Sequence, residues 1–170
     1  MTSPSTYRLM TFIQNNIALF LIAVTVIVVD RIVKFYITEN LRIGESIPVF
    51  GSFMMITRSE NRGAAFGMLH GQNWVFIIAS IIVILVMIYY YNEIIYNRLL
   101  VYATAAILAG TVGNMMDRLF FSHVIDYIEF SFWPIFNLSD VALTAGVTLL
   151  IVYMYLWQKE PEKEATYVHY

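Results

Sequence analysis

The sequence predicts an α-helical membrane protein with four transmembrane helices and a small β-sheet or cradle at one membrane face. Hydrophobic residues make up 59% of the 170 residues and charged residues only 13%, whereas an ordinary soluble domain is about 25% charged. Four runs without a charged side chain approach or exceed the ~20 apolar residues that cross a hydrocarbon core. Polar residues suited to chemistry gather near the ends of these runs on one side.

The four uncharged runs give the positions of the expected helices. The runs are Leu9–Val29, Gly63–Asn92, Leu99–Met116 and Val141–Gln158. The corresponding spans are expected at 10–33, 73–91, 98–117 and 139–157, within a single domain of residues 1–170. No run has a polar helical face for water, which argues against a soluble bundle. An even number of spans places both termini on one side, where the charged segment 159–170 is expected to form a disordered tail.

The first long connection, Phe35–Asn73, is predicted to contain short strands. Its middle, Ile47–Thr57, is apolar and aromatic and is interrupted by Pro48 and Gly51. That composition favours strands with a turn over a helix.

The second long connection, Asp117–Ser139, has an alternating pattern that predicts a strand. One face would carry Asp126, Ile128, Phe130 and Phe132, and the other Tyr127, Glu129, Ser131 and Trp133. Bare strand edges are not tolerated in lipid. We therefore expect the sheet at the membrane interface, with its aromatic side chains in the headgroup region.

Carboxylates, amides and arginines collect where these long connections meet the helices. The set comprises Asp30, Asn61, Arg62, Asn114, Asp117, Arg118, Asp126, Asn137 and Asp140. Because polar groups are costly in membranes, this collection indicates a functional site. Residues three apart share a helix face, so Asn114 is expected beside Asp117. Either Asn137 or Ser139 can cap the last helix.

Two of the carboxylates are expected in unlike surroundings. The helix dipole lowers the cost of a charged Asp140 at the start of the last helix. Asp126 lies on an apolar strand face, where desolvation should raise its pKa. Such a pair can divide acid and base roles in hydrolysis, and two close carboxylates would share one proton.

Other chemistries find little support in the sequence. The absence of cysteine excludes disulfides, thiol nucleophiles and thiolate metal sites. His70, His123 and His169 lack ligand spacing, so no metal or cofactor is expected. There is no serine nucleophile elbow and no basic stripe for nucleic acid. A proton- or ion-coupled transporter using intramembrane carboxylates stays open, as does a non-catalytic lipid- or peptide-binding module.

Five short motifs occur in a recognisable order. They are Asp30 with Lys34, Asn61–Gly67, Gly113–Arg118, Val124–Asp126 and Phe136–Asp140. Together they resemble the lipoprotein signal peptidase (signal peptidase II) family over roughly residues 10–157. Leu138-Ser139 departs from the Ile-Ala that is familiar in this family, and Ser139 could add a hydrogen bond.

The resemblance implies a bacterial inner-membrane aspartic peptidase that cuts diacylglyceryl-modified prolipoproteins before the lipidated cysteine. It implies a catalytic pair at Asp126 and Asp140. Supporting or substrate-binding positions would be Asp30, Lys34, Asn61, Gly63, Asn114, Asp117, Arg118 and Asn137. Membrane phospholipid and globomycin-type inhibitors are implied partners, and four helices can enclose one site in a monomer.

The resemblance also implies an orientation, with the site near the periplasmic face and both termini cytoplasmic. The distribution of cations points the other way. Arg31, Lys34, Arg42, Arg58, Arg62 and Arg118 lie on the site side, against Arg8, Arg98, Lys159 and Lys163 on the opposite side. Counted by the positive-inside rule, the site side would be cytoplasmic. We follow the resemblance, because several of the site-side cations can be held inside the structure.

Overall fold

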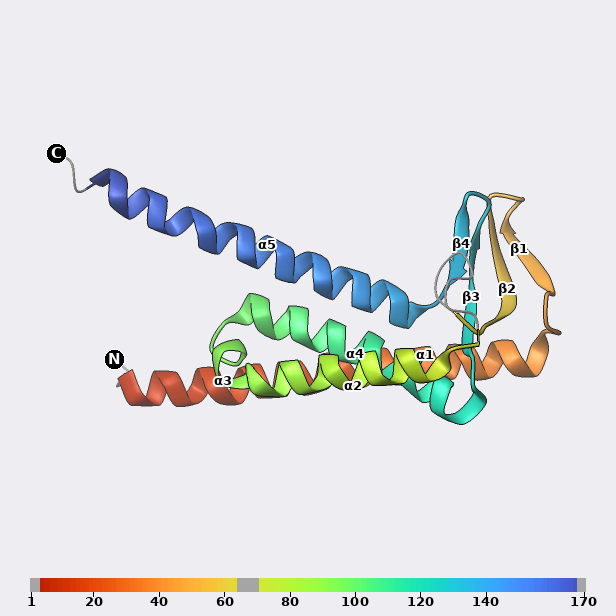
Figure 1. Ribbon diagram of the computed structural model, residues 1–170, viewed down its shortest axis with the longest axis horizontal. Coiled ribbons are helices and arrows are strands. Elements are labelled where there is room, and N and C mark those ends of the chain that lie inside the picture. The colour runs from red at the N-terminus through yellow and green to blue at the C-terminus, as the bar shows by residue number, and fades with distance from the viewer. Residues whose placement is uncertain (1–3, 64–70, 168–170) are drawn as a thin grey trace.

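A computed structural model describes residues 4–63 and 71–167 of the chain. These residues form helices joined to one antiparallel sheet (Figure 1). The helices are α1 (Pro4–Asn40), α2 (Asn73–Tyr89), α3 (Tyr91–Ile94), α4 (Arg98–Phe121) and α5 (Leu138–Tyr167). The strands are β1 (Ser46–Phe50), β2 (Met54–Asn61), β3 (Val124–Phe130) and β4 (Trp133–Phe136).

Three helices, α1, α4 and α5, are long and apolar enough to cross a membrane by length and composition. The helix α2 is apolar but has only 17 residues. Large apolar side chains are exposed along α1, among them Ile13, Phe20 and Val28. Exposed apolar surface of this extent suits contact with lipid rather than water. The protein is therefore a mainly helical, multi-pass membrane protein with a small sheet.

The helix α4 lies at the centre of the helical part, in contact with α1, α2 and α5. Small residues allow the backbones of α4 and α5 to approach closely. A Cβ atom added at Gly146 would lie 2.7 Å from the backbone oxygen of Ala103 and 2.8 Å from the backbone nitrogen of Ile107. A side chain at Gly110 would meet the backbone oxygen of Ser139. Packing through small residues is a common way for membrane helices to associate.

The sheet has the order β1-β2-β3-β4, and each strand is antiparallel to its neighbour. The strands predicted within Ile47–Thr57 are confirmed as β1 and β2, and the turn between them has Gly51 at φ +55°. The single strand predicted through Trp133 is wrong. The chain instead turns at Ser131 and Phe132, and β4 pairs back on β3. Without glycine or proline at this turn, alternation alone gave no signal for it.

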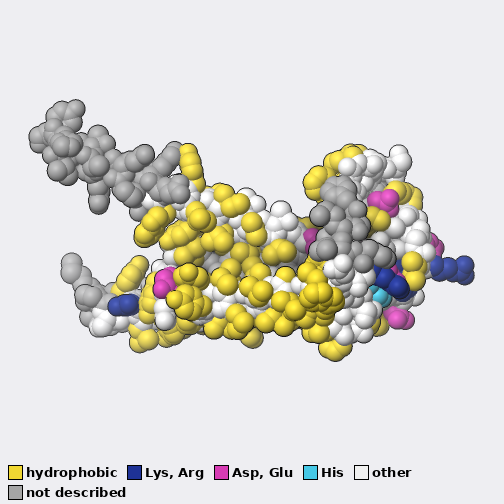
Figure 2. Space-filling model, viewed as in Figure 1, with side chains coloured by type: hydrophobic (Ala, Val, Ile, Leu, Met, Phe, Trp, Pro, Cys, Tyr) yellow, Lys and Arg dark blue, Asp and Glu magenta, His cyan; other side chains and the backbone are white. Residues whose placement is uncertain are grey.

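The sheet lies across one end of the helices, and the start of α1 and the end of α5 lie at the other end (Figure 1). Apolar side chains cover most of the visible helical surface, while charged side chains gather toward the ends (Figure 2). The backbone of α5 is helical to Tyr167, so it extends into the segment 159–170 for which a disordered tail was expected. The Glu, Lys and Ala residues there have high helix propensity. Residues 168–170 lie outside the described part of the chain.

Candidate active site

A cavity of about 420 Å³ opens between α2, α4, α5 and the strands β3 and β4. We call it the active-site cavity. Asp126 and Asp140 both line it, as do four other predicted site residues, Asn61, Gly63, Asn114 and Arg118. Much of the remaining wall is apolar, including Phe76, Val83, Phe136 and Leu143. Two carboxylates therefore face one largely apolar space at the end of the helices nearest the sheet.

Asp126 lies on β3 and is 2% exposed. Its two carboxylate oxygens accept hydrogen bonds from Asn61 Nδ2 at 2.9 Å and from Asn137 Nδ2 at 2.6 Å. Burial raises the pKa of Asp126 to about 7, and the nearby charge of Asp140 adds to this. The hydrogen bonds from the two asparagines oppose the rise in pKa without cancelling it. Asp126 can thus hold a proton near neutral pH.

Asp140 is held at the first turn of α5 by reciprocal hydrogen bonds with Asn137. The backbone N–H of Asp140 donates to Asn137 Oδ1 at 2.9 Å, and the backbone N–H of Asn137 donates to Asp140 Oδ2 at 3.1 Å. This is the geometry of a capping box, in which a carboxylate three residues inside the helix answers the N-cap side chain. The prediction that Asn137 can cap the last helix is confirmed.

Asn137 and Asn114 connect the two aspartates through direct contacts. Asn137 Nδ2 reaches Asp126 and also donates to Asn114 Oδ1 at 3.1 Å. Asn114 Nδ2 donates to Asp140 Oδ1 at 2.7 Å. Each amide thus uses its donor on a carboxylate, which fixes both carboxylate groups in orientation. The two asparagines are 8% exposed or less, so water competes little for these bonds.

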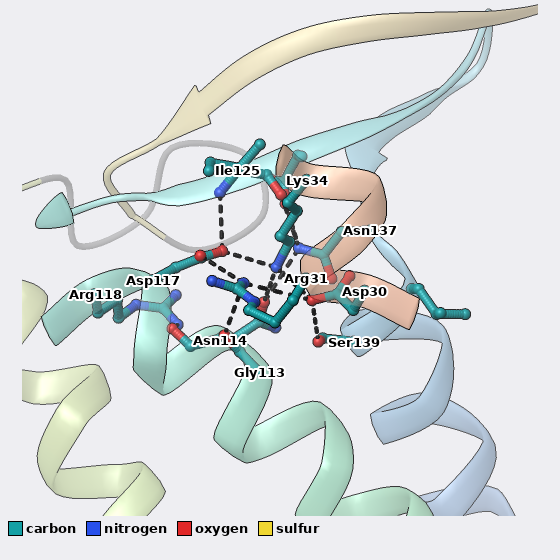
Figure 3. Close-up of polar contacts among 12 residues, drawn as sticks. Asp30, Arg31, Lys34, Gly113, Asn114, Asp117, Arg118, Ile125, Asn137 and Ser139 are labelled. Atoms are coloured by element: carbon teal, nitrogen blue, oxygen red, sulfur yellow. Dashed lines mark hydrogen bonds and ion pairs between the residues drawn. The ribbon is translucent and has the colours of Figure 1, made fainter. Parts of the chain in front are cut away.

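A buried charge cluster joins α1 to α4 (Figure 3). Lys34 Nζ contacts Asp30 Oδ2 at 2.8 Å and Asp117 Oδ2 at 2.7 Å. Arg31 contacts Asp117 Oδ1 at 2.6 Å. Asp117 also accepts a hydrogen bond from the backbone N–H of Ile125, next to Asp126. Both Asp117 oxygens thus face cations of this cluster, and Asp117 is not among the residues that line the active-site cavity.

Residues outside the predicted set complete the cluster. Ser139 Oγ donates to Asp30 Oδ2 at 2.8 Å, and Tyr127 Oη donates to Asp30 Oδ1 at 3.3 Å. Burial raises the pKa of Tyr127 above its usual value, which keeps its hydroxyl available as a donor. A Cβ at Gly113 would meet Ser139 Oγ, so the glycine allows this contact. In the sequence, only the serine at position 139, where the family usually has alanine, indicated the hydrogen bond of Ser139. No sequence pattern indicated the contacts of Arg31 or Tyr127.

Arg118 lies at the edge of the active-site cavity with hydrogen-bonding capacity to spare. Its guanidinium carbon lies 4.5 Å from the centre of the Phe76 ring. It makes only long contacts with the backbone oxygens of Asn114, at 3.4 Å, and Gly63, at 3.5 Å. Its Nε atom is buried and has no hydrogen-bond partner among the described residues. Arg118 can therefore donate to a ligand in the cavity.

Some predicted features lie elsewhere or beyond the described residues. Residues 64–67 of the Asn61–Gly67 motif lie outside the described part, as do His70 and His169. His123 lies near Glu60 and is not among the residues that line the active-site cavity. Across residues 4–63 and 71–167, no group of three or more His, Cys, Asp or Glu residues could hold a metal ion. The described site offers paired carboxylates, amides and one arginine, which suits acid–base hydrolysis by water.

Comparison with protein families identifies similar sequences along most of the chain. A family model described as signal peptidase (SPase) II matches residues 22–156. A lipoprotein signal peptidase of Halothermothrix orenii is 38% identical over 141 residues, which cover 83% of this chain and 96% of the relative. A lipoprotein signal peptidase of Desulfitobacterium hafniense is 41% identical over 137 residues, covering 79% and 91%.

Solved structures show the same likeness in three dimensions. A structure described as "Bacterial membrane enzyme structure by the in meso method at 2.3 A resolution" matches with a TM-score of 0.79 and 34% identity. It covers 83% of this chain and 89% of the other. A second bacterial membrane enzyme structure matches with a TM-score of 0.74 and 35% identity, covering 80% and 91%.

Proposed function

The chain belongs to the signal peptidase II family, and from that premise we propose that Asp126 and Asp140 are its catalytic pair. Its activity is that of a lipoprotein signal peptidase of the aspartic type. It removes the signal peptide of a diacylglyceryl-modified prolipoprotein by cutting before the lipidated cysteine. The observation that carries the catalytic assignment is that both carboxylates line one cavity and are joined through Asn137. The named relatives give no support to the transporter alternative.

In this proposal, Asp126 is the acid and Asp140 the base. The raised pKa of Asp126 favours its protonated form near neutral pH. Asp140 accepts hydrogen bonds from the backbone of Asn137 and from Asn114, and it sits at a helix N-terminus. Both features favour the ionised form of Asp140 against the effect of its burial, so we assign the role of base to this carboxylate. One proton shared between two carboxylates is the state that aspartic chemistry requires.

In the reaction, one proton starts on Asp126 and a second is taken from the attacking water. Asp140 removes a proton from water as the water oxygen bonds to the scissile carbonyl carbon, while Asp126 gives its proton to the carbonyl oxygen. The proton now on Asp140 passes to the amide nitrogen, and the C–N bond breaks. A hydroxyl of the tetrahedral intermediate returns a proton to Asp126 as the carboxyl product forms.

Arg118 is the group best placed to stabilise charge on the carbonyl oxygen as it develops. It lines the same cavity as both aspartates and has an unpaired buried donor. A donor of this kind contributes on the order of 3 kcal/mol to transition-state stabilisation in other hydrolases. Gly63, whose carbonyl Arg118 contacts, lines the same cavity.

A second opening supports the arrival of substrate from the lipid. It is a groove of about 630 Å³ along the outer side of α5, and it shares Trp133, Phe136 and Asp140 with the active-site cavity. Residues Val141, Ala145 and Leu149 continue it along the helix. An apolar groove of this kind suits a signal helix or acyl chain that approaches sideways, with membrane phospholipid around it. Globomycin-type inhibitors would occupy the active-site cavity of a monomer.

The catalytic assignment is tested by the variants Asp126→Asn and Asp140→Asn, assayed for cleavage of a lipidated prolipoprotein. Each variant is expected to lose activity while keeping a melting temperature close to that of the parent protein. Glu39→Gln, an exposed carboxylate at the end of α1, is the matched control and should cut normally. Normal turnover by either aspartate variant would rule out the pair.

We also propose that α2 is a fourth span and that the sheet faces the periplasm of a bacterial inner membrane. At about 1.5 Å per residue, 17 helical residues span about 26 Å, near the lower limit for crossing. Because the chain has no cysteine, single variants Glu39→Cys and Glu93→Cys can be labelled in cells with an impermeant maleimide. Labelling of position 39 alone is expected. Labelling of both positions would contradict a span at α2.

A further inference from the structure

A separate cavity of about 450 Å³ lies between the end of α1, the end of α4 and the outer face of β2 and β3. We call it the basic cavity. Ile125 and His123 line it, whereas Val124 and Asp126 line the active-site cavity. Successive side chains of a strand point to opposite faces. The two cavities are therefore on opposite sides of β3, and a substrate held at Asp126 does not occupy the basic cavity.

Basic side chains from different elements converge on this cavity. Arg31 and Lys34 come from α1, Arg58 from β2, and His123 from the segment before β3. Arg31 and Lys34 are balanced by the two buried carboxylates of the charge cluster. Beyond that cluster, Glu60 is the one carboxylate among the described residues that lines the cavity, and it lies 3.6 Å from Arg58 and from His123.

Arg62 adds a further positive charge near this rim, 3.9 Å from Glu60. Two arginines and a histidine thus surround one glutamate, and all three separations exceed an ordinary charge-assisted hydrogen bond. The rim of the cavity therefore has an excess of positive charge, and in the described part of the chain neither Arg58 nor Arg62 has a carboxylate within close hydrogen-bonding distance.

Two of the arginines have unused donors. The Nε atoms of Arg31 and Arg58 are buried and have no hydrogen-bond partner among the described residues. Arg58 uses Nη1 on the backbone oxygens of Thr38, at 2.7 Å, and Leu41, at 2.9 Å, which fixes its guanidinium against the end of α1. Arg58 Nη2 lies 3.6 Å from Glu60 Oε1, which is long for a charge-assisted hydrogen bond, so an anionic oxygen in the cavity can accept from it.

Apolar side chains at the border of the basic cavity indicate the source of that anion. Phe35 and Phe121 line the cavity and are 68% and 52% exposed. Ile32 and Phe120, one helical turn or one residue away, are also exposed. These side chains lie near the ends of membrane-spanning helices, where lipid chains meet headgroups. The basic side chains inside the cavity suit a phosphate, and the apolar side chains at its border suit acyl chains attached to that phosphate.

From this combination we propose that the basic cavity binds the phosphodiester of a membrane glycerophospholipid, with Arg58 as its principal ligand. The acyl chains lie against Phe35 and Phe121. The site is distinct from the catalytic pair, and it ties α1, β2 and β3 together at the membrane surface. This inference does not depend on which residues perform the cleavage.

Native mass spectrometry of the detergent-solubilised protein tests the site with three probes. These are phosphatidylglycerol, diacylglycerol with the same acyl chains, and inorganic phosphate. Phosphatidylglycerol is expected to stay bound, while diacylglycerol is not retained and phosphate does not displace the lipid. Equal retention of diacylglycerol would overturn the proposal, and displacement by equimolar phosphate would overturn the assignment to a lipid. These measurements need only the parent protein.

Variants locate the bound lipid. Arg58→Gln should weaken phosphatidylglycerol binding at least about tenfold, through loss of charge-assisted hydrogen bonds. Thr38→Phe should weaken it by filling the cavity while keeping every charge. Arg42→Gln, at an exposed arginine outside the cavity, is the control and should bind normally. Unchanged binding by folded Thr38→Phe would place the lipid elsewhere, because a lipid in the active-site cavity or the α5 groove would be unaffected.

Discussion

Asn137 and Asp140 exchange two hydrogen bonds at the start of α5, each backbone N–H donating to the other residue's side chain. The same asparagine donates its side-chain amide to Asp126 at 2.6 Å. One residue therefore begins a membrane helix and also orients the two proposed catalytic carboxylates. The folding signal of α5 and the geometry of the site cannot be changed separately by removing this side chain.

A substitution that keeps the cap but shortens the side chain should separate these roles. Asn137→Ser retains an N-cap oxygen but loses the buried amide donor to Asp126 and Asn114, so we expect the free energy of unfolding to fall by about 1–3 kcal/mol. Loss of the donor to Asp126 should lower kcat at least about tenfold. Asn97→Ser, at the N-cap of α4, makes the same change away from the site and should leave kcat unaltered. Equal kcat values for the two variants would contradict the bridging role.

The pH dependence of cleavage should follow the protonation of Asp126. Its pKa is raised to about 7, chiefly by burial, so it is protonated below that pH and ionised above it. If the protonated form is the acid, kcat/KM should fall as pH rises through about 7. Asn61 donates to the carboxylate and lowers its pKa, so Asn61→Ala should move this limb to higher pH. Asn40→Ala, at the exposed end of α1, serves as control, and a shift to lower pH in Asn61→Ala would oppose the assignment.

The buried charge cluster predicts a large loss of stability when Lys34 is removed. Lys34→Met leaves Asp30 without its 2.8 Å partner and Asp117 without its 2.7 Å partner. Breaking a buried ion pair from one side costs about 3–5 kcal/mol. The double variant Lys34→Met, Asp117→Asn should lose less than the two single losses combined, because it removes one uncompensated charge. Additive losses in thermal unfolding would show that the pair is not coupled.

Close packing of α4 on α5 predicts sensitivity to one methyl group. Gly146→Ala would place a Cβ within 2.8 Å of backbone atoms of α4, which cannot move as a side chain can. We expect about 1–3 kcal/mol of destabilisation and reduced cleavage, because Asp140 lies on the same helix. Thr148→Ala, on the exposed side of α5, is the comparison and should melt like the parent. A Gly146→Ala protein as stable as that comparison would mean that the helices can move apart freely.

The sequence by itself determined the membrane environment, the order of the helices and the identity of the candidate site residues. These features depend on composition and on the spacing of residues within single helices and strands, so they can be predicted without knowing how the elements pack. The burial of Asp126 and the cap at Asn137 were foreseen in the same way, from an apolar strand face and a helix start.

Only the tertiary structure decided which polar groups meet. Asp30 is contacted by Tyr127 and Ser139, and Asp117 is contacted by Arg31. The members of each pair are too far apart in sequence for helix or strand periodicity to predict the contact. The turn at Ser131 depends on pairing between β3 and β4 rather than on a turn residue. The basic cavity likewise exists only because strand alternation sends Ile125 and Asp126 to opposite faces, each against a different set of helices. Local patterns select the residues, and long-range packing determines their partners.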